Sequence, residues 1–125
     1  MNESDLLTPN GGVAFTYSHS QREGAEVFIC RGPMVLNCHP TLDELIGEAR
    51  AARQTRVVLD LAAVTRVDSV GVGTLAKILR TALGTGHDLV LVLNAGVCQA
   101  LDQASLSNVF RSAGSLEAAL KLPSK

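Results

Sequence analysis

Asp68 and Ser69 place a carboxylate and a hydroxyl side by side at the expected start of a helix. They follow the apolar run Val57–Leu61 and precede Gly71 and Gly73, within the stretch VVLDLAAVTRVDSVGVGTL. The first four backbone N–H groups of a helix have no partners inside it, so either polar side chain is suited to cap them. Each glycine costs roughly 1 kcal/mol of helix propensity relative to alanine. We therefore expect another molecule to approach the backbone closely here.

Other kinds of chemistry have only partial signatures in the chain. Gly71–Ala76 fits the GxGxxA form of a dinucleotide fingerprint, but the next apolar strand closes at Asn94 without the acidic residue that binds the ribose. No GxSxG elbow supports a triad of Ser69, His87 and Asp68, and no second pair at zinc-ligand spacing accompanies Cys38-His39. The GxxxxGK[ST] loop is absent as well. We therefore expect no enzyme activity, no cofactor and no metal centre.

The composition limits the classes of partner. The 125 residues suit one domain, and 46% hydrophobic residues supply its core. With 11 basic and 12 acidic residues and only 3% aromatic residues, the chain lacks the footprint of a nucleic-acid-binding protein. The cluster of Arg50, Arg53 and Arg56 is interpreted as a solvated helix end. No apolar run has the about 18 residues of a membrane span, and no secretory signal is seen, so we expect a cytoplasmic protein without membrane insertion.

Short apolar runs mark the expected strands. These are Val13–Ser20, Glu26–Cys30 with an end at Gly32-Pro33, Arg56–Leu61 and Leu89–Leu93. Apolar side chains at successive positions are typical of strands that are covered on both faces. Residues 1–11 are polar and rich in turn formers, so we interpret them as a flexible tail and residues 12–122 as the domain.

Helical periodicity fills the segments between these strands. Thr41 and Glu44 stand at capping-box spacing, which predicts a first helix from Thr41. Asn94 and Ser115 are the expected caps of two later helices. The second helix begins near Ser69 and ends at Gly84 and Gly86, and its expected buried stripe is Val72, Leu75, Ala76, Leu79 and Leu83. This alternation predicts a single α/β domain with a mixed, mostly parallel central sheet and helices packed on one side.

The sequence also resembles the STAS domain family of sulphate transporters and anti-sigma factor antagonists. The resemblance covers residues 12–122 and includes the Gly32 turn, DLAAVTRVDSVGVGTL, the strand LVLVLN and the helix SLEAAL. It implies partner switching, in which an antagonist binds an anti-sigma factor serine kinase and is released when a hydroxyl at this helix start is phosphorylated. The resemblance implies Ser69 as the phosphorylation site. The residues expected to bind the partner are Arg66, Asp68, Ser69, Val70, Gly71, Gly73, Thr74 and Lys77.

Val70 departs from the pattern of many such antagonists, which carry a second hydroxyl at this position and take the phosphate there. A single hydroxyl after the aspartate also resembles stressosome-like scaffolds and the STAS subunit of an ABC-type lipid transporter. Those alternatives leave partner binding intact without phosphorylation, and Ser69 would then be an unmodified helix cap. Homodimer formation stays open.

Overall fold

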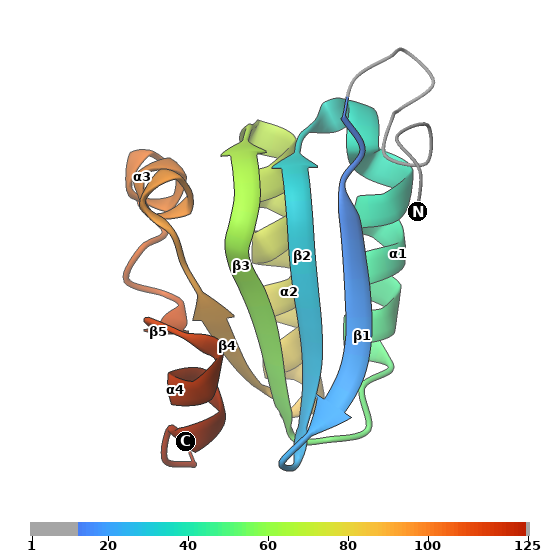
Figure 1. The fold of residues 1–125 in the computed structure, drawn as a ribbon, viewed down its shortest axis with the longest axis vertical. Coiled ribbons are helices and arrows are strands. Elements are labelled where there is room, and N and C mark those ends of the chain that lie inside the picture. The colour runs from blue at the N-terminus through green and yellow to red at the C-terminus, as the bar shows by residue number, and fades with distance from the viewer. Residues whose placement is uncertain (1–12, 125) are drawn as a thin grey trace.

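A computed structural model of the chain describes residues 13–124, which form one five-stranded sheet with helices packed against it (Figure 1). The strands are β1 Thr16–Arg22, β2 Ala25–Met34, β3 Arg56–Val67, β4 Asp88–Val92 and β5 Arg111–Ala113. They lie side by side in sequence order; β1 is antiparallel to β2, and the other neighbouring pairs are parallel. The predicted mixed, mostly parallel α/β fold is confirmed. The predicted tail, residues 1–11, lies outside the described residues.

Helices connect the parallel strands, and one more helix follows the last strand. The connections are the 3-10 turn η2 Leu36–Cys38 with α1 His39–Arg50, then α2 Ser69–Thr85 and α3 Ala95–Gln103, and the helix after β5 is α4 Leu116–Lys121. Figure 1 shows α1 and α2 crossing the same face of the sheet. The main core lies between this face and the helices, and its largest fully buried side chains are Phe15, Phe28, Met34, Leu42, Leu45, Leu59, Leu61, Leu75, Ile78, Leu91 and Leu101.

The opposite face of the sheet is covered in part by α4. Ala119 is fully buried there, and Leu116 and Leu120 pack beside it. The strand residues of this second core are Ala25, Val27, Val58, Val90 and Val92. The prediction of helices on one side is therefore wrong, because the strands are apolar on both faces and α4 covers the second one.

β2 continues through Gly32 and Pro33, where the sequence predicted its end. Gly32 has a φ of +87°, and the register with β3 shifts between these two residues. A Cβ at Gly32 would lie 2.6 Å from the Ala14 carbonyl oxygen, so only glycine fits here. The irregular register tolerates a proline without breaking the strand. A Gly-Pro pair therefore marks a bend in β2 and not its end.

Other strand bounds also differ from the prediction. β1 begins at Thr16 instead of Val13, and β3 runs to Val67 instead of Leu61. The three-residue strand β5 was not predicted, because it is too short to show any periodicity. The long β3 is the difference that matters most, since it carries the chain to the start of α2.

α1 begins at His39, so the predicted capping box at Thr41 is wrong. The N-cap is Cys38, whose side chain caps nothing, and Pro40 lies in the first turn. Proline has a fixed φ that suits the first turn of a helix, and the turn η2 leads directly into α1. Backbone geometry therefore starts this helix instead of a side-chain cap.

The predicted helix caps at Asn94 and Ser115 and the end of α2 at Gly86 are confirmed, whereas Gly84 lies inside α2. Asn94 Oδ1 accepts the Val97 N–H at 2.8 Å, and Ser115 Oγ accepts the Ala118 N–H at 3.1 Å. α2 ends at Gly86, which has a φ of +77°. Polar caps and a left-handed glycine set these ends, as their sequence signatures predict.

α2 buries a stripe that differs from the predicted one. The buried residues are Gly71, Thr74, Leu75, Ile78 and Ala82. Leu83, which we expected in the core, is 63% exposed. The prediction is right for Leu75 and in part for Leu79, which packs against the core, but wrong for Leu83. α2 has apolar residues on more than one face, and small residues such as Gly71 and Thr74 fit against the sheet.

Candidate functional site

Asp68 is the N-cap of α2 and uses both carboxylate oxygens. Oδ1 accepts the backbone N–H groups of Val70 at 2.9 Å and Gly71 at 3.1 Å. Oδ2 accepts the backbone N–H of Leu36 at 3.0 Å. By residue type either Asp68 or Ser69 is suited to cap this helix, and in the structure Asp68 does so. The carboxylate therefore fixes the loop geometry and leaves the neighbouring hydroxyl free.

Ser69 is the first residue of α2, and its side chain is exposed. No described residue hydrogen-bonds to its hydroxyl, since the cap is supplied by Asp68. The helix dipole places a partial positive charge at this end. An added anionic group at Ser69 would therefore be accessible and electrostatically tolerated by the helix.

The two glycines of the motif have different surroundings. A Cβ at Gly71 would lie 2.2 Å from the Met34 carbonyl oxygen and 2.8 Å from Cγ1 of Val67. Gly73 has no neighbouring atom within 4 Å of the same position. The expectation that Gly71 admits a partner is therefore wrong, because Gly71 is buried and lets α2 pack on the end of β2. Gly73 keeps open space beside the helix.

The remaining predicted partner residues do not form one patch. Thr74 is 5% exposed and donates its hydroxyl to the Val70 carbonyl oxygen at 2.9 Å, so its expected exposure is wrong. Val70 is half-buried and packs against the main core. Lys77 is exposed, but eight residues of helix place it about 12 Å along α2 from Ser69. Arg66 is exposed near the end of β3, just before the cap.

The fold brings further residues to this end of the sheet whose roles are not visible in the sequence. Leu36 is 59% exposed and is joined to Asp68 across 32 positions of sequence. The Asn94 side-chain amide donates to the carbonyl oxygens of Leu61, Ala62 and Val64, at 2.8 Å for Val64. Asn94 thereby holds the last part of β3 against the start of α3. The sequence predicts Asn94 as a helix cap, and its second role, as a donor to the β3 carbonyl groups, is visible only in the structure.

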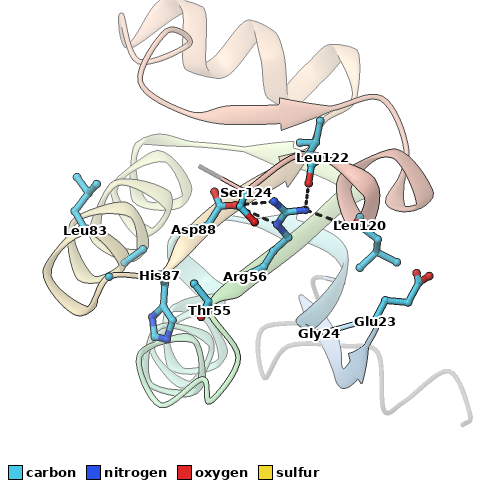
Figure 2. A pocket seen from close by; sticks show the side chains of 12 residues that line it. Glu23, Gly24, Thr55, Arg56, Leu83, His87, Asp88, Leu120, Leu122 and Ser124 are labelled. Atoms are coloured by element: carbon cyan, nitrogen blue, oxygen red, sulfur yellow. Dashed lines mark hydrogen bonds and ion pairs between the residues drawn. The ribbon is translucent and has the colours of Figure 1, made fainter.

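The opposite end of the sheet carries a charged cluster beside a hollow of about 600 Å³ (Figure 2). Arg56 donates from Nε and Nη2 to Asp88 Oδ2 at 3.1 and 2.9 Å, and from Nη1 to the Leu122 carbonyl oxygen at 2.7 Å. Arg111 pairs with the same carboxylate oxygen at 2.7 Å. The side chain of Arg56 is only 12% exposed, so its interpretation as a solvated residue is wrong. This cluster ties β3, β4 and β5 to the segment after α4.

The alternative chemistries lack the geometry they need. His87 lies just after α2, so the helix separates it from Ser69 by about 25 Å, and the imagined triad cannot form. Gly71 packs against protein, which leaves no close approach for a dinucleotide phosphate. Among residues 13–124, no three His, Cys, Asp or Glu side chains gather to hold a metal ion. In this same part of the chain, every helix is too short or too polar to cross a lipid bilayer.

The fold is a five-stranded mixed sheet in which β3 leads to a helix that begins at Ser69 and is capped by Asp68. This combination is that of a STAS domain. The chain belongs to the STAS domain family, whose match covers residues 16–119. The resemblance predicted from sequence is thereby confirmed. Among curated proteins, no relative matches this sequence.

Solved structures with the same fold come from several bacteria. An anti-sigma factor antagonist from Mycobacterium paratuberculosis is 25% identical with a TM-score of 0.74, and the match covers 92% of this chain and 96% of that one. A putative anti-sigma factor antagonist from Thermotoga maritima is 17% identical, with a TM-score of 0.73 and 84% and 92% of the two chains covered. The STAS domain of a SulP transporter from Vibrio cholerae is 21% identical, with a TM-score of 0.65 and 94% and 89% covered.

Proposed function

We propose that the chain is an anti-sigma factor antagonist-like regulatory protein. It binds a serine kinase that acts as an anti-sigma factor in the cytoplasm, and phosphorylation at Ser69 ends the binding. The observation that carries the proposal is the exposed Ser69 hydroxyl, held at the start of α2 by the cap that Asp68 provides. The similarity to an anti-sigma factor antagonist at 25% identity supports the same assignment.

The physical basis of the switch is a change of charge at an exposed helix start. A phosphate on Ser69 adds about −1.5 to −2 charges at neutral pH. The positive end of the helix dipole stabilises this charge inside the chain, so the fold persists. A partner that binds over the same helix start contacts a neutral hydroxyl before the modification and a hydrated, doubly charged phosphate after it. One modification therefore leaves the fold intact and weakens the binding of the partner.

The kinase supplies ATP and performs the chemical step, so this chain needs no cofactor of its own. Incubation with the cognate kinase and ATP is expected to add one phosphate by intact mass. Ser69→Ala should abolish this addition, whereas Ser107→Ala, a change at another exposed serine, should leave it unchanged. An unmodified chain under these conditions would contradict the switch.

The phosphorylated state can be imitated without the kinase reaction. Ser69→Asp is expected to weaken kinase binding at least about tenfold, which corresponds to about 1.4 kcal/mol. The thermal unfolding midpoint should stay within about 2 °C of the wild-type value, because the helix start accepts the charge. Ser107→Asp is the matched control. Unchanged binding by Ser69→Asp would rule out electrostatic release.

A second candidate function is an unmodified STAS subunit of an ABC-type lipid transporter or of a stressosome-like scaffold. The observation that favours it is Val70, which cannot accept a phosphate and whose side chain packs on the core. Such a subunit would copurify with the transporter ATPase or with scaffold proteins in the absence of ATP. Ser69→Ala would then leave its binding unchanged.

A further inference from the structure

Arg66 lies between two hollows at the Ser69 end of the sheet. The first, of about 560 Å³, lies between the end of β3 and the start of α3, and its lining includes Thr65, Arg66, Asn94, Gln99 and Gln103. The second, of about 340 Å³, lies beside η2 and is lined by Val13, Pro33, Val35, Asn37, Cys38, Thr65 and Arg66. Thr65 and Arg66 line both hollows, so these two residues form the ridge between them.

Arg66 is the single charged residue among the described residues that line these two hollows. No residue between positions 13 and 124 forms an ion pair with its guanidinium, and its side chain is exposed. Arg56 and Arg111, in contrast, share the carboxylate of Asp88 at the other end of the sheet. Within residues 13–124 the positive charge of Arg66 therefore has no partner of opposite charge.

Among the residues that the structure describes, none offers Arg66 a free carboxylate nearby. Asp68 lies two residues away, but three backbone N–H groups already occupy its carboxylate. The polar side chains in the first hollow are the neutral amides of Asn94, Gln99 and Gln103 and the hydroxyl of Thr65. Apolar side chains of Val13 and Leu36 are exposed on the other side, at 58% and 59%. An acidic side chain with apolar neighbours is the complement of this surface.

We propose that Arg66 binds a carboxylate on an Asp- or Glu-containing segment of the partner protein, which lies across the ridge between the two hollows. This inference rests on the proposed partner binding and specifies the chemistry of the partner. Arg66 and Ser69 are three residues apart, so their Cα atoms lie within about 11 Å of each other. A phosphate on Ser69 consequently comes close to the bound carboxylate, repels it and competes for the same guanidinium.

Peptide titration tests the charge preference without the partner. The probe is the acetylated, amidated peptide Leu-Glu-Glu-Leu-Glu, added to the full chain labelled with nitrogen-15, with Leu-Gln-Gln-Leu-Gln as its neutral counterpart. The acidic peptide is expected to shift the amide signals of residues 64–67 and 95–97, and the neutral one to shift neither group. Arg66→Gln should weaken this binding about tenfold, as expected for a lost charged hydrogen bond. Arg53→Gln, at an exposed arginine in the loop before β3, is the matched control.

Equal binding by Arg66→Gln, or shifts confined to other parts of the chain, would overturn the inference.

Cross-linking extends the test to the kinase that modifies Ser69. Arg66→Lys treated with a carbodiimide should form an amide with an acidic residue of the bound kinase, and Arg53→Lys should not. If Arg66→Gln weakens kinase binding while Ser69→Asp does not, the switch fails and this inference stands. If Ser69→Asp weakens binding while Arg66→Gln does not, the inference fails and the switch stands.

Discussion

The carboxylate of Asp68 joins two segments that are far apart in sequence, because its Oδ2 accepts the backbone N–H of Leu36 at 3.0 Å. The same side chain caps α2 through Oδ1. The exposed side chain of Leu36 is therefore fixed relative to Ser69 by a single residue. This relationship makes Asp68 a positioning residue for the surface around Ser69.

Asp68→Ala is expected to lower the free energy of unfolding by about 1 to 2 kcal/mol, through loss of the helix cap and of the bond to Leu36. Urea denaturation followed by circular dichroism measures this change. Asp102→Ala, at an exposed aspartate of α3, is the control and should change stability by less than about 0.5 kcal/mol. An equal effect of both substitutions would show that the cap is not important for stability.

Gly71→Ala and Gly73→Ala are a matched pair with opposite expected effects. Alanine at 71 drives a methyl group into the Met34 carbonyl oxygen and should cost about 2 kcal/mol. Alanine at 73 meets no atom within 4 Å and should stabilise the helix by up to about 1 kcal/mol. Thermal unfolding of the two variants separates them. Two stable variants would contradict the close contact between α2 and β2.

Glu26 gives a prediction about pH. It is 2% exposed, and this burial by itself raises the pKa of the carboxyl. Hydrogen bonds from the Gln54 N–H, His19 and Gln21 and the charge of His19 outweigh burial, so the pKa lies below its ordinary value of 4.5. Since the folded-state pKa is lowered, the stability that ionised Glu26 contributes is complete above pH 4.5 and is lost as the pH falls through the folded-state pKa. The nearest of these contacts is His19 Nε2 at 2.9 Å.

The measurement is urea unfolding of the wild-type chain and of Glu26→Gln from about pH 3 to about pH 6. The difference in unfolding free energy should be constant at the upper end and should shrink at the lower end. Glu44→Gln, at an exposed residue of α1, should show no such dependence. A difference that is independent of pH would mean that Glu26 contributes only by packing.

Asp88→Asn is expected to destabilise the fold by about 3 kcal/mol, because Arg56 and Arg111 would lose a shared and largely buried carboxylate. Chemical denaturation gives the loss of stability. Modification of Ser69 at a temperature where the variant is folded should proceed as in the wild type, since this cluster lies at the other end of β3. Reduced modification of the folded variant would link the two ends of the sheet.

Much of the fold was predictable from local patterns. The buried strands β3 and β4, the caps at Asn94 and Ser115 and the end of α2 at Gly86 all follow from the residue types at those positions. The bend at Gly32 and the start of α1 were not predictable, because both depend on packing between segments. The stripe that α2 buries also depends on the shape of the sheet face, and periodicity does not specify that shape.

In the site, too, local features were predictable from sequence and features that depend on packing between segments were not. Ser69 and Asp68 could be selected from sequence, because a hydroxyl beside a capping carboxylate is a local feature. The separate roles of Gly71 and Gly73 became clear only from the distance to Met34. The proximity of Leu36 to Asp68 depends on the parallel pairing of β2 with β3, which brings their ends to the same edge of the sheet.

The contact between Gly71 and the Met34 carbonyl also limits how the chain can respond to a new charge. With backbone resting on backbone, the first turn of α2 has no room to withdraw toward the sheet. Under the proposed switch, the response to a phosphate on Ser69 therefore falls to the bound partner and not to a retreat of this helix toward the sheet. The free chain should accordingly keep the same backbone conformation with and without the modification.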